Sequence, residues 1–459
     1  MKPQIYLSIL SMFLISCQDS RQLDSKIISS FGEQPYITSN SFGKIAIVFG
    51  KIDSIYYSSS IDNGDSFSKP SLVANHNGLV LGYSSGPSIA ITSKYEVVAA
   101  PDTLGNLNAY SRPIDAKSWS GPFRINDVEA SVGENLSDIA STPDGILYCV
   151  WIDTRTPEQG NQSEHSIEKP ENHAEHSSSN TNNHTIESIP EIKDDLSVMT
   201  PIGITRGELF EKIGDIPKNS YLAFHDDNEG NLYWVFLDKD KNVLKAENIE
   251  EYKNFRMRNG SREKPQGKIY FSSSQDGGKT WSKSRLIFDS PDGSVCECCK
   301  PSIISDNVGN ITVMFRNNFD GSRDLHYTQS TDGGKTFSPP EKLGSGTWKL
   351  DGCPMDGGDL VANREGVLNT IWQRNGEIYT SNSSLSEKKI GSGRSPSISS
   401  NNQKTYIIFS QGENILTTNS GNSTPIKIGT GSSPKVIALK NGALYFWVNL
   451  DGINFKKVI

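Results

Sequence analysis

The sequence predicts an all-β protein that closes into a ring of seven four-stranded blades, a β-propeller. A short turn motif occurs three times, each time after a strand-like run, and a longer unit of strands repeats at blade-sized intervals of roughly 40 to 55 residues. Abundant Ser, Asn, Gly, Ile and Tyr favour strands and turns over helices. The 459 residues suffice for several ordinary domains or for one such closed ring.

The turn motif reads Ser-x-Asp-x-Gly-x-Thr/Ser-aromatic and spans Ser60–Phe67, Ser274–Trp281 and Ser330–Phe337. Its Asp carboxylate can accept hydrogen bonds from backbone amides of its own tight turn, and its Gly supplies a position of positive φ. The aromatic side chain then packs back between sheets. The defining residues of this hairpin turn are Asp62, Gly64 and Phe67, then Asp276, Gly278 and Trp281, then Asp332, Gly334 and Phe337.

A longer unit recurs around these turns: a strand led by a Pro in most units, a Gly-containing turn, an apolar strand, a loop and a Tyr-rich strand. The seventh unit lacks an outermost strand, which Lys26–Ser30 could supply, so that the two ends of the chain close the ring. Six blades is the alternative count. The seven units begin near Pro35, Pro87, Leu136, Pro301, Pro354, Pro396 and Pro434.

The third unit is interrupted by an insertion at residues 156–266, after which the blade resumes. Its first part, residues 156–197, is rich in His, Ser and Asn without apolar periodicity, which predicts disorder. Its second part contains strand-like runs at Tyr221–Phe224 and Asn231–Leu237. We therefore expect a subdomain or lid on a propeller that occupies residues 26–459.

The N-terminus predicts export. Residues 1–17 contain a short apolar run, Ile5–Ile15, that ends at Ser16-Cys17 and resembles the bacterial lipobox, in which the cysteine is lipidated. Residues 18–25 then form a polar tether, and an ordinary secretory signal is the alternative. We expect a lipoprotein of the bacterial cell envelope, anchored at the outer membrane or cell surface through the lipid on Cys17 alone.

The charge balance narrows the partners. The formal net charge is −8 and no basic block is present, which argues against nucleic acid. We expect a monomer.

The turn motif resembles the BNR, or Asp-box, repeats of sialidase-like β-propellers. The resemblance implies that each Asp-box lies between the third and outermost strands of a blade, on the face opposite the binding site. It also implies an anionic glycan as partner, and sialidase-type glycoside hydrolysis if the protein is catalytic. Sialidases proper have six blades, and their Arg-Ile-Pro signature is absent, with Phe123–Asn126 the nearest string.

In this architecture the unusual residues gather on the binding face, because it carries the inter-blade connections and the loops between second and third strands. Arginines there suit a carboxylate, sulfate or phosphate. The resemblance suggests Arg155, Arg316 and Arg323 as carboxylate ligands and Asp153 or Asp324 as acid/base. No Tyr/Glu pair can be assigned, and Arg323-Asp324 could equally be an ion pair that fixes a loop. Further candidates on this face are Tyr83 as nucleophile and Arg374, Arg394 and Trp348 as substrate ligands.

Four cysteines lie near this face: Cys296, Cys298, Cys299 and Cys353. The Cys-x-Cys-Cys run with a distant Gly-Cys-Pro resembles a group of bacterial sialidase-like propellers. We expect a disulfide from Cys353 to Cys298 or Cys299, and a soft-metal site for copper or zinc is the alternative. No other cofactor is expected, and Cys149 should be a buried thiol.

Three functions remain open from the sequence. The chain could be a surface glycosidase of sialidase type, a non-catalytic propeller that binds an anionic glycan or a protein, or a metal-handling lipoprotein that uses the cysteine cluster. Whether it is an enzyme is left undecided.

Overall fold

The computed structural model describes residues 25–40, 42–82, 84–114, 116–155, 221–226, 232–237, 243–248, 266–352, 354–363, 366–382, 387–401 and 403–459. All regular elements of this described part are β-strands, and none of it forms a helix of membrane-spanning length and hydropathy. The predicted signal peptide, Cys17 and the tract 156–197 lie outside the described residues.

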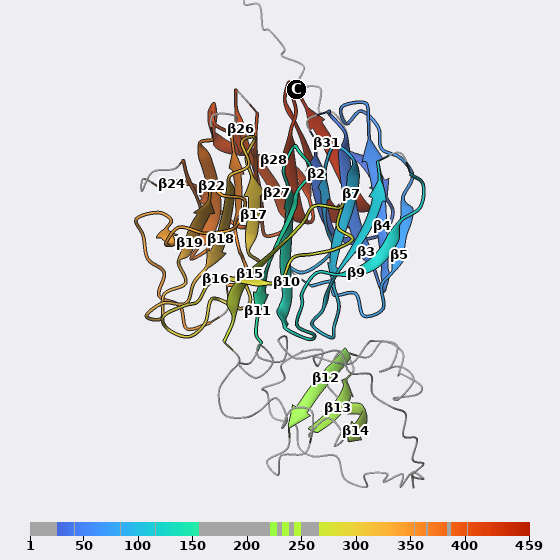
Figure 1. The fold of residues 1–459 in the computed structure, drawn as a ribbon, viewed down its shortest axis with the longest axis vertical. Coiled ribbons are helices and arrows are strands. Elements are labelled where there is room, and N and C mark those ends of the chain that lie inside the picture. The colour runs from blue at the N-terminus through green and yellow to red at the C-terminus, as the bar shows by residue number, and fades with distance from the viewer. Residues whose placement is uncertain are drawn as a thin grey trace, which may run out of the picture.

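Seven four-stranded antiparallel sheets form a ring around a central axis, which confirms the predicted seven-bladed propeller (Figure 1). In each of blades one, two, four, five and six, four consecutive strands run from the axis to the rim. Blades one to three are β2 (Glu33–Ser39), β3 (Ile45–Lys51), β4 (Ser54–Ser60) and β5 (Ser71–Asn75); β6 (Ser88–Ile91), β7 (Tyr95–Pro101), β8 (Leu107–Pro113) and β9 (Ser120–Arg124); and β10 (Val132–Ser141), β11 (Leu147–Asp153), β15 (Lys268–Ser274) and β16 (Arg285–Phe288).

The remaining blades follow the same order, except that the seventh takes its outermost strand from the start of the chain. They are β17 (Ser302–Ser305), β18 (Ile311–Arg316), β19 (Leu325–Ser330) and β20 (Glu341–Lys342); β21 (Asp359–Ala362), β22 (Leu368–Arg374), β23 (Glu377–Ser381) and β24 (Lys388–Ser392); β25 (Arg394–Ser400), β26 (Thr405–Gln411), β27 (Asn414–Asn419) and β28 (Asn422–Thr430); and β29 (Ser432–Ala438), β30 (Ala443–Asn449), β31 (Gly452–Val458) and β1 (Lys26–Ser29).

The N-terminal strand closes the ring as predicted. β1 pairs antiparallel with β31, with Lys26 opposite Phe455. Ile28 of β1 is buried with Phe446 of blade seven and Ile45 of blade one, so the closing strand also joins the apolar contact between these blades. The edge that β31 would otherwise expose is therefore covered.

The third blade is interrupted as the sequence indicates. β11 pairs with β15 in continuous register from Leu147 opposite Ser274 to Asp153 opposite Lys268, although the insertion separates the two strands in the chain. Within the insertion, β12 (Tyr221–Asp226), β13 (Leu232–Leu237) and β14 (Val243–Asn248) form a three-stranded antiparallel sheet. The two strand-like runs predicted there correspond to β12 and β13.

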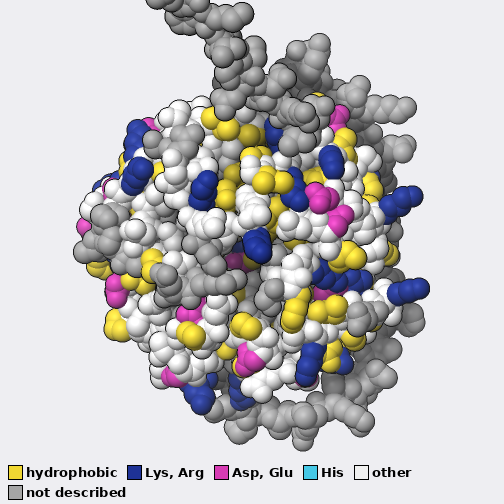
Figure 2. Space-filling view, turned by 90° about the horizontal axis from the view of Figure 1, so that it is seen from above, with side chains coloured by type: hydrophobic (Ala, Val, Ile, Leu, Met, Phe, Trp, Pro, Cys, Tyr) yellow, Lys and Arg dark blue, Asp and Glu magenta, His cyan; other side chains and the backbone are white. Residues whose placement is uncertain are grey.

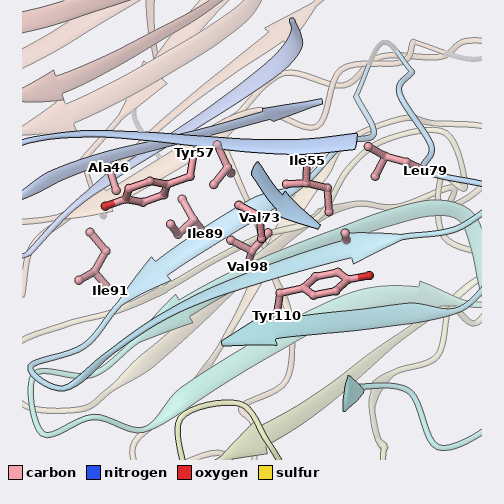
Figure 3. Packing of buried hydrophobic residues seen from close by; sticks show 11 residues of the cluster. Ala46, Ile55, Tyr57, Val73, Leu79, Ile89, Ile91, Val98 and Tyr110 are labelled. Carbon is pink, nitrogen blue, oxygen red and sulfur yellow. The ribbon is translucent and has the colours of Figure 1, made fainter. Parts of the chain in front are cut away.

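Apolar side chains fill the space between neighbouring blades. Figure 3 shows one such cluster, in which Ile55 and Tyr57 of β4 face Ile89 of β6 and Val98 of β7. These side chains are at least 97% buried, so this packing holds blade one against blade two.

Each predicted Asp-box forms its turn between a third and an outermost strand. In the last copy the Asp332 carboxylate accepts hydrogen bonds from the Ser330 hydroxyl at 2.8 Å and the Thr336 amide at 2.9 Å. Gly334 has φ of 82°, and a Cβ there would lie 2.6 Å from the Phe271 ring of blade three. Phe337 packs edge-on against the same ring. The box therefore seals its blade onto the preceding one.

The Asp-boxes lie on the face where the chain ends, because β31 and the strands before the boxes are all third strands of their blades. Figure 2 shows this face, which is at the top of Figure 1. Acidic and basic side chains are scattered over it among uncharged ones. This face therefore has no strong charge of one sign.

The box carboxylates make stability depend on pH. Hydrogen bonds from Ser66 and Thr336 hold the pKa of Asp62 and Asp332, respectively, well below the usual range. A depressed folded pKa stabilises the fold above the unfolded pKa of about 3.9, and this stabilisation is lost as pH falls through the folded pKa. The melting temperature should therefore fall below about pH 4. A D62N/D332N variant should show a shallower fall in thermal melts from pH 7 to pH 2; identical slopes would contradict this role.

Candidate functional site

A hollow of about 130 Å³ opens at the axis, on the face opposite the Asp-boxes. It is lined by residues at the starts of inner strands, among them Tyr36, Ser85, Lys300, Asp356, Ser395 and Lys435. A cavity of about 150 Å³ can hold benzene, and the hollow is slightly smaller, so it has room for a small polar group of a ligand. The inner strands therefore build a small polar site at the mouth.

Irregular strand starts shape this mouth. Gln34, Ser395 and Ser433 each precede a Pro and have φ of 51°, 52° and 52°. Next to each of them the pairing of the inner strand with its neighbour shifts register. Such a bulge re-aims side chains, and positive φ in non-glycine residues is concentrated at functional sites. The same device in blades one, six and seven supports a site at the axis.

One side of the hollow is an ion pair against an aromatic ring. The Lys300 ammonium lies 3.2 Å from the Asp138 carboxylate and 4.6 Å from the centre of the Tyr36 ring. Burial, followed by the charge of Asp138 and a hydrogen bond to it, raises the pKa of the Tyr36 phenol well above its usual range. This side is therefore internally neutralised.

The other side carries a cation without a direct counter-ion. No carboxylate among the described residues lies within ion-pair distance of the Lys435 ammonium, and burial lowers the pKa of Lys435. Asp359 is the strongest opposing charge, but its Oδ2 accepts hydrogen bonds from Ser397 Oγ at 2.9 Å and the Ile398 amide at 3.0 Å. An enclosed ammonium in this state favours an anionic ligand.

The predicted pair Asp153 and Arg155 forms a buried network. The Asp153 carboxylate accepts hydrogen bonds from Arg155, Ser131 and Trp151, all between 2.8 and 2.9 Å. The Arg155 guanidinium also lies 4.1 Å from the centre of the Tyr270 ring. Both side chains therefore hold the start of the insertion loop, and their predicted roles in acid/base chemistry and carboxylate binding gain no support from this geometry.

Arg316, Arg323 and Trp348 come together, as predicted for one loop cluster. The Arg316 guanidinium is buried and donates to the carbonyls of Asp356, Arg323 and Gln373. Arg323 Nε donates to the carbonyl of Leu350 at 3.4 Å, and the ring of Trp348 lies 5.5 Å from the Arg316 guanidinium. The Asp324 carboxylate accepts the Trp348 amide at 2.8 Å and faces Lys342, not Arg323.

The other predicted ligands differ in accessibility. Arg374 makes a two-pronged ion pair with Glu387, at 2.7 and 2.5 Å, so its charge is neutralised. Arg394 is exposed next to Ser395 at the rim of the hollow, and donates to the carbonyl of Pro354 at 2.9 Å. Arg394 is therefore the predicted arginine that the structure brings to the hollow. Tyr83 lies outside the described residues.

The cysteine cluster forms, but not with a bridge at Cys299. Cys296 and Cys299 carry free thiols whose sulfurs lie 3.5 Å apart, and the Cys298 sulfur lies 3.7 and 4.0 Å from them. The Cys299–Cys353 alternative is therefore wrong, because the sharp turn directs this sulfur toward Cys296. A Cys298–Cys353 bridge stays a prediction, since Cys353 lies outside the described residues. Cys149 is a free, buried thiol as expected.

Sequence reasoning missed the charged lining of the hollow, Lys300, Lys435 and Asp356. A signal was present, because Lys300 directly precedes the Pro that leads its blade and Lys435 directly follows one. Such residues occupy inter-blade positions, which converge on the axis once the ring closes.

Comparison with known proteins agrees with the repeat assignment. A BNR repeat-like domain model matches residues 261–362, which include two of the three Asp-boxes. No curated protein matches the sequence. The chain thus has a BNR-type repeat within an all-β propeller.

Several solved structures are similar to this chain at low identity. An intramolecular trans-sialidase from Ruminococcus gnavus shares 11% identity at a TM-score of 0.40, with 94% of each chain covered. An α-L-arabinanase from Penicillium chrysogenum shares 10% at 0.43, over 95% of this chain and 98% of the other. A fucose-specific lectin from Aleuria aurantia shares 12% at 0.39, over 83% and 94%. These scores are too low to support conclusions about the site.

The Asp153–Arg155 network leads to a stability prediction. Arg155→Met would leave a buried carboxylate without its cation, so the free energy of unfolding should fall by about 3 kcal/mol. Lys388→Met, at an exposed position, should leave it unchanged. Denaturant unfolding followed by tryptophan fluorescence measures both. Equal stability of the Arg155 variant and the wild type would show that Arg155 does not support the fold.

Proposed function

We propose that this chain is an exported, lipid-anchored, sialidase-like propeller that binds the carboxylate of an acidic sugar in its axial hollow. The observation that carries the proposal is the enclosed ammonium of Lys435, which has no carboxylate within ion-pair distance in the described part of the chain. Serine hydroxyls and the Asp356 carboxylate around the hollow supply partners for sugar hydroxyls. The BNR-type repeat is consistent with a glycan ligand.

The strand order indicates which face of the propeller a lipid anchor would hold toward the membrane. β1 runs antiparallel to the third strand β31, so it begins on the Asp-box face, opposite the hollow. A lipid on Cys17, joined to β1 by the polar tether, would attach the protein to the membrane by the Asp-box side. The hollow would then face away from the membrane, where a glycan can enter.

Binding without hydrolysis fits the described groups better than sialidase catalysis. The predicted carboxylate-binding triad would need three guanidiniums that converge on a ligand, whereas Arg155, Arg316 and Arg323 donate to protein groups. An activated nucleophile needs a depressed pKa or an adjacent base. Tyr36 has the adjacent carboxylate Asp138, but the pKa of its phenol is raised.

The binding proposal predicts the effect of one substitution. The propeller without its lipid should retain acidic sugars on a glycan array, and Lys435→Met should weaken this binding about tenfold or more, because a charge-assisted contact is lost. Lys440→Met, at an exposed position two residues beyond the same strand, is the matched control and should bind as wild type. Affinity should also fall as pH rises through the lowered pKa of Lys435.

Two results would contradict the proposal. Neutral and acidic sugars could bind equally well, which would exclude selection by charge. Alternatively, the Lys435 and Lys440 variants could bind acidic sugars equally, which would place the ligand elsewhere.

The Tyr36–Asp138 contact makes hydrolysis the second candidate, and turnover separates the two functions. We expect no release of a fluorogenic aglycone from sialosides or hexuronides. Release that Tyr36→Phe abolishes while Lys440→Met preserves it would instead establish a glycosidase with Tyr36 in the reaction.

A further inference from the structure

Three strongly exposed apolar side chains lie on the Asp-box face, at blades one and seven. Phe42 is 77%, Ile61 86% and Ile459 85% exposed. Phe42 belongs to the turn between β2 and β3, Ile61 belongs to the first Asp-box, and Ile459 follows β31. Figure 2 shows hydrophobic side chains among the charges of this face. We call these three residues the apolar corner.

Strand pairing places the three residues in neighbouring parts of the face. Ile45 at the start of β3 pairs with Ser60 at the end of β4, so the turn that carries Phe42 lies beside the first Asp-box. That box reaches over blade seven, because Asp65 accepts the Lys457 ammonium near the end of β31 at 2.9 Å. The third apolar side chain follows two residues further on. The corner therefore lies on both sides of the closing contact between blades one and seven.

The path of the chain, and not apolar exposure alone, distinguishes this face. The mouth face also carries exposed apolar side chains, Ile52 between β3 and β4 and Leu450 between β30 and β31. However, Cys17 precedes Lys26, the first residue of β1, by nine positions in the sequence. Nine residues span at most about 32 Å. A lipid on Cys17 would therefore keep the Asp-box side of blade seven close to a bilayer.

The residues of the corner suit the interface of a phospholipid bilayer. Exposed lysines flank it, Lys26 at the start of β1 and Lys440 in the turn between β29 and β30. Apolar side chains enter the boundary between headgroups and acyl chains, and ammonium groups are attracted to lipid phosphates. A short tether gives a high local concentration, so a contact too weak to bind the membrane alone becomes populated.

We propose that the apolar corner enters the headgroup region of a phospholipid bilayer and thereby fixes the orientation of the propeller. This inference rests on the lipid anchor of the proposed function. A lipid alone would leave the propeller free to rotate at the end of its tether. The additional contact through folded residues holds the hollow on the side away from the membrane.

The test introduces tryptophan probes into a membrane-anchored chain. The mature chain is coupled through the Cys17 thiol to a maleimide-lipid in vesicles of phosphatidylethanolamine and phosphatidylglycerol. With brominated acyl chains, the emission added by Phe42→Trp or Ile61→Trp should fall by about half, because an interfacial tryptophan lies within reach of the acyl chains. The matched controls Ile52→Trp and Leu450→Trp, at exposed positions of the opposite face, should keep their emission.

A second set of variants separates membrane contact from simple proximity. With Ile459→Trp as the probe, Phe42→Asp combined with Ile61→Asp should abolish the quenching, because carboxylates oppose insertion. The matched pair Ile52→Asp and Leu450→Asp should leave the quenching of this probe unchanged. Thermal melts establish that these substitutions at exposed positions preserve the fold.

Three outcomes would overturn the proposal: no quenching at the corner, equal quenching on both faces, or quenching of the Ile459→Trp probe that survives the two carboxylates. The proposed function is tested separately. Because the lipid is coupled chemically, these results do not depend on lipidation in the cell, which the mass of Cys17 in protein from the cell envelope reports. Glycan binding with Lys435→Met reports on the hollow alone.

Discussion

The pairing of β1 with β31 is the constraint on which the rest of this structure depends. Without ring closure, the first and last blades would each leave one apolar face uncovered, and the edge of β31 would stay unpaired. Residues from opposite ends of the chain achieve this, with Ile28 buried among side chains of blades seven and one. Ring closure then brings the inner strands to a common axis and creates the hollow.

Charged side chains lie close together at the axis, where they are less solvated than they would be at the rim of the propeller. Lys300 and Asp138 neutralise each other there, and Tyr36 covers the pair. Lys435 differs, because the carboxylate that opposes its charge most strongly, Asp359, is engaged with blade six. Burying an ammonium without a direct partner costs free energy. A bound anionic ligand would offset this cost. This imbalance is the basis on which we propose an anionic ligand for the mouth.

The arginines near the mouth have different kinds of partner. Arg155 and Arg374 neutralise carboxylates and so fix loops, which leaves their charges little reach into the mouth. Arg316 is held by carbonyl dipoles and keeps its charge available to the neighbouring thiols. The structure thus separates the Lys435 ammonium at the axis from the cysteine cluster in the joint between blades three and four.

The sequence by itself determined the blade order, the closing strand, the interrupted third blade and the Asp-box turns. These features depend on local rules, since an alternating apolar run makes a strand and Asp-x-Gly makes a turn wherever they occur. It also predicted which face carries the inter-blade connections and the candidate site residues on them. The partners of Arg155, Arg316 and Asp324 were decided only by tertiary structure, because a guanidinium binds whichever carboxylate or carbonyl the fold brings near. The same holds for Lys300 and Lys435, which are more than 130 residues apart in the chain. Both line one hollow because the closed ring turns the start of every blade toward the axis.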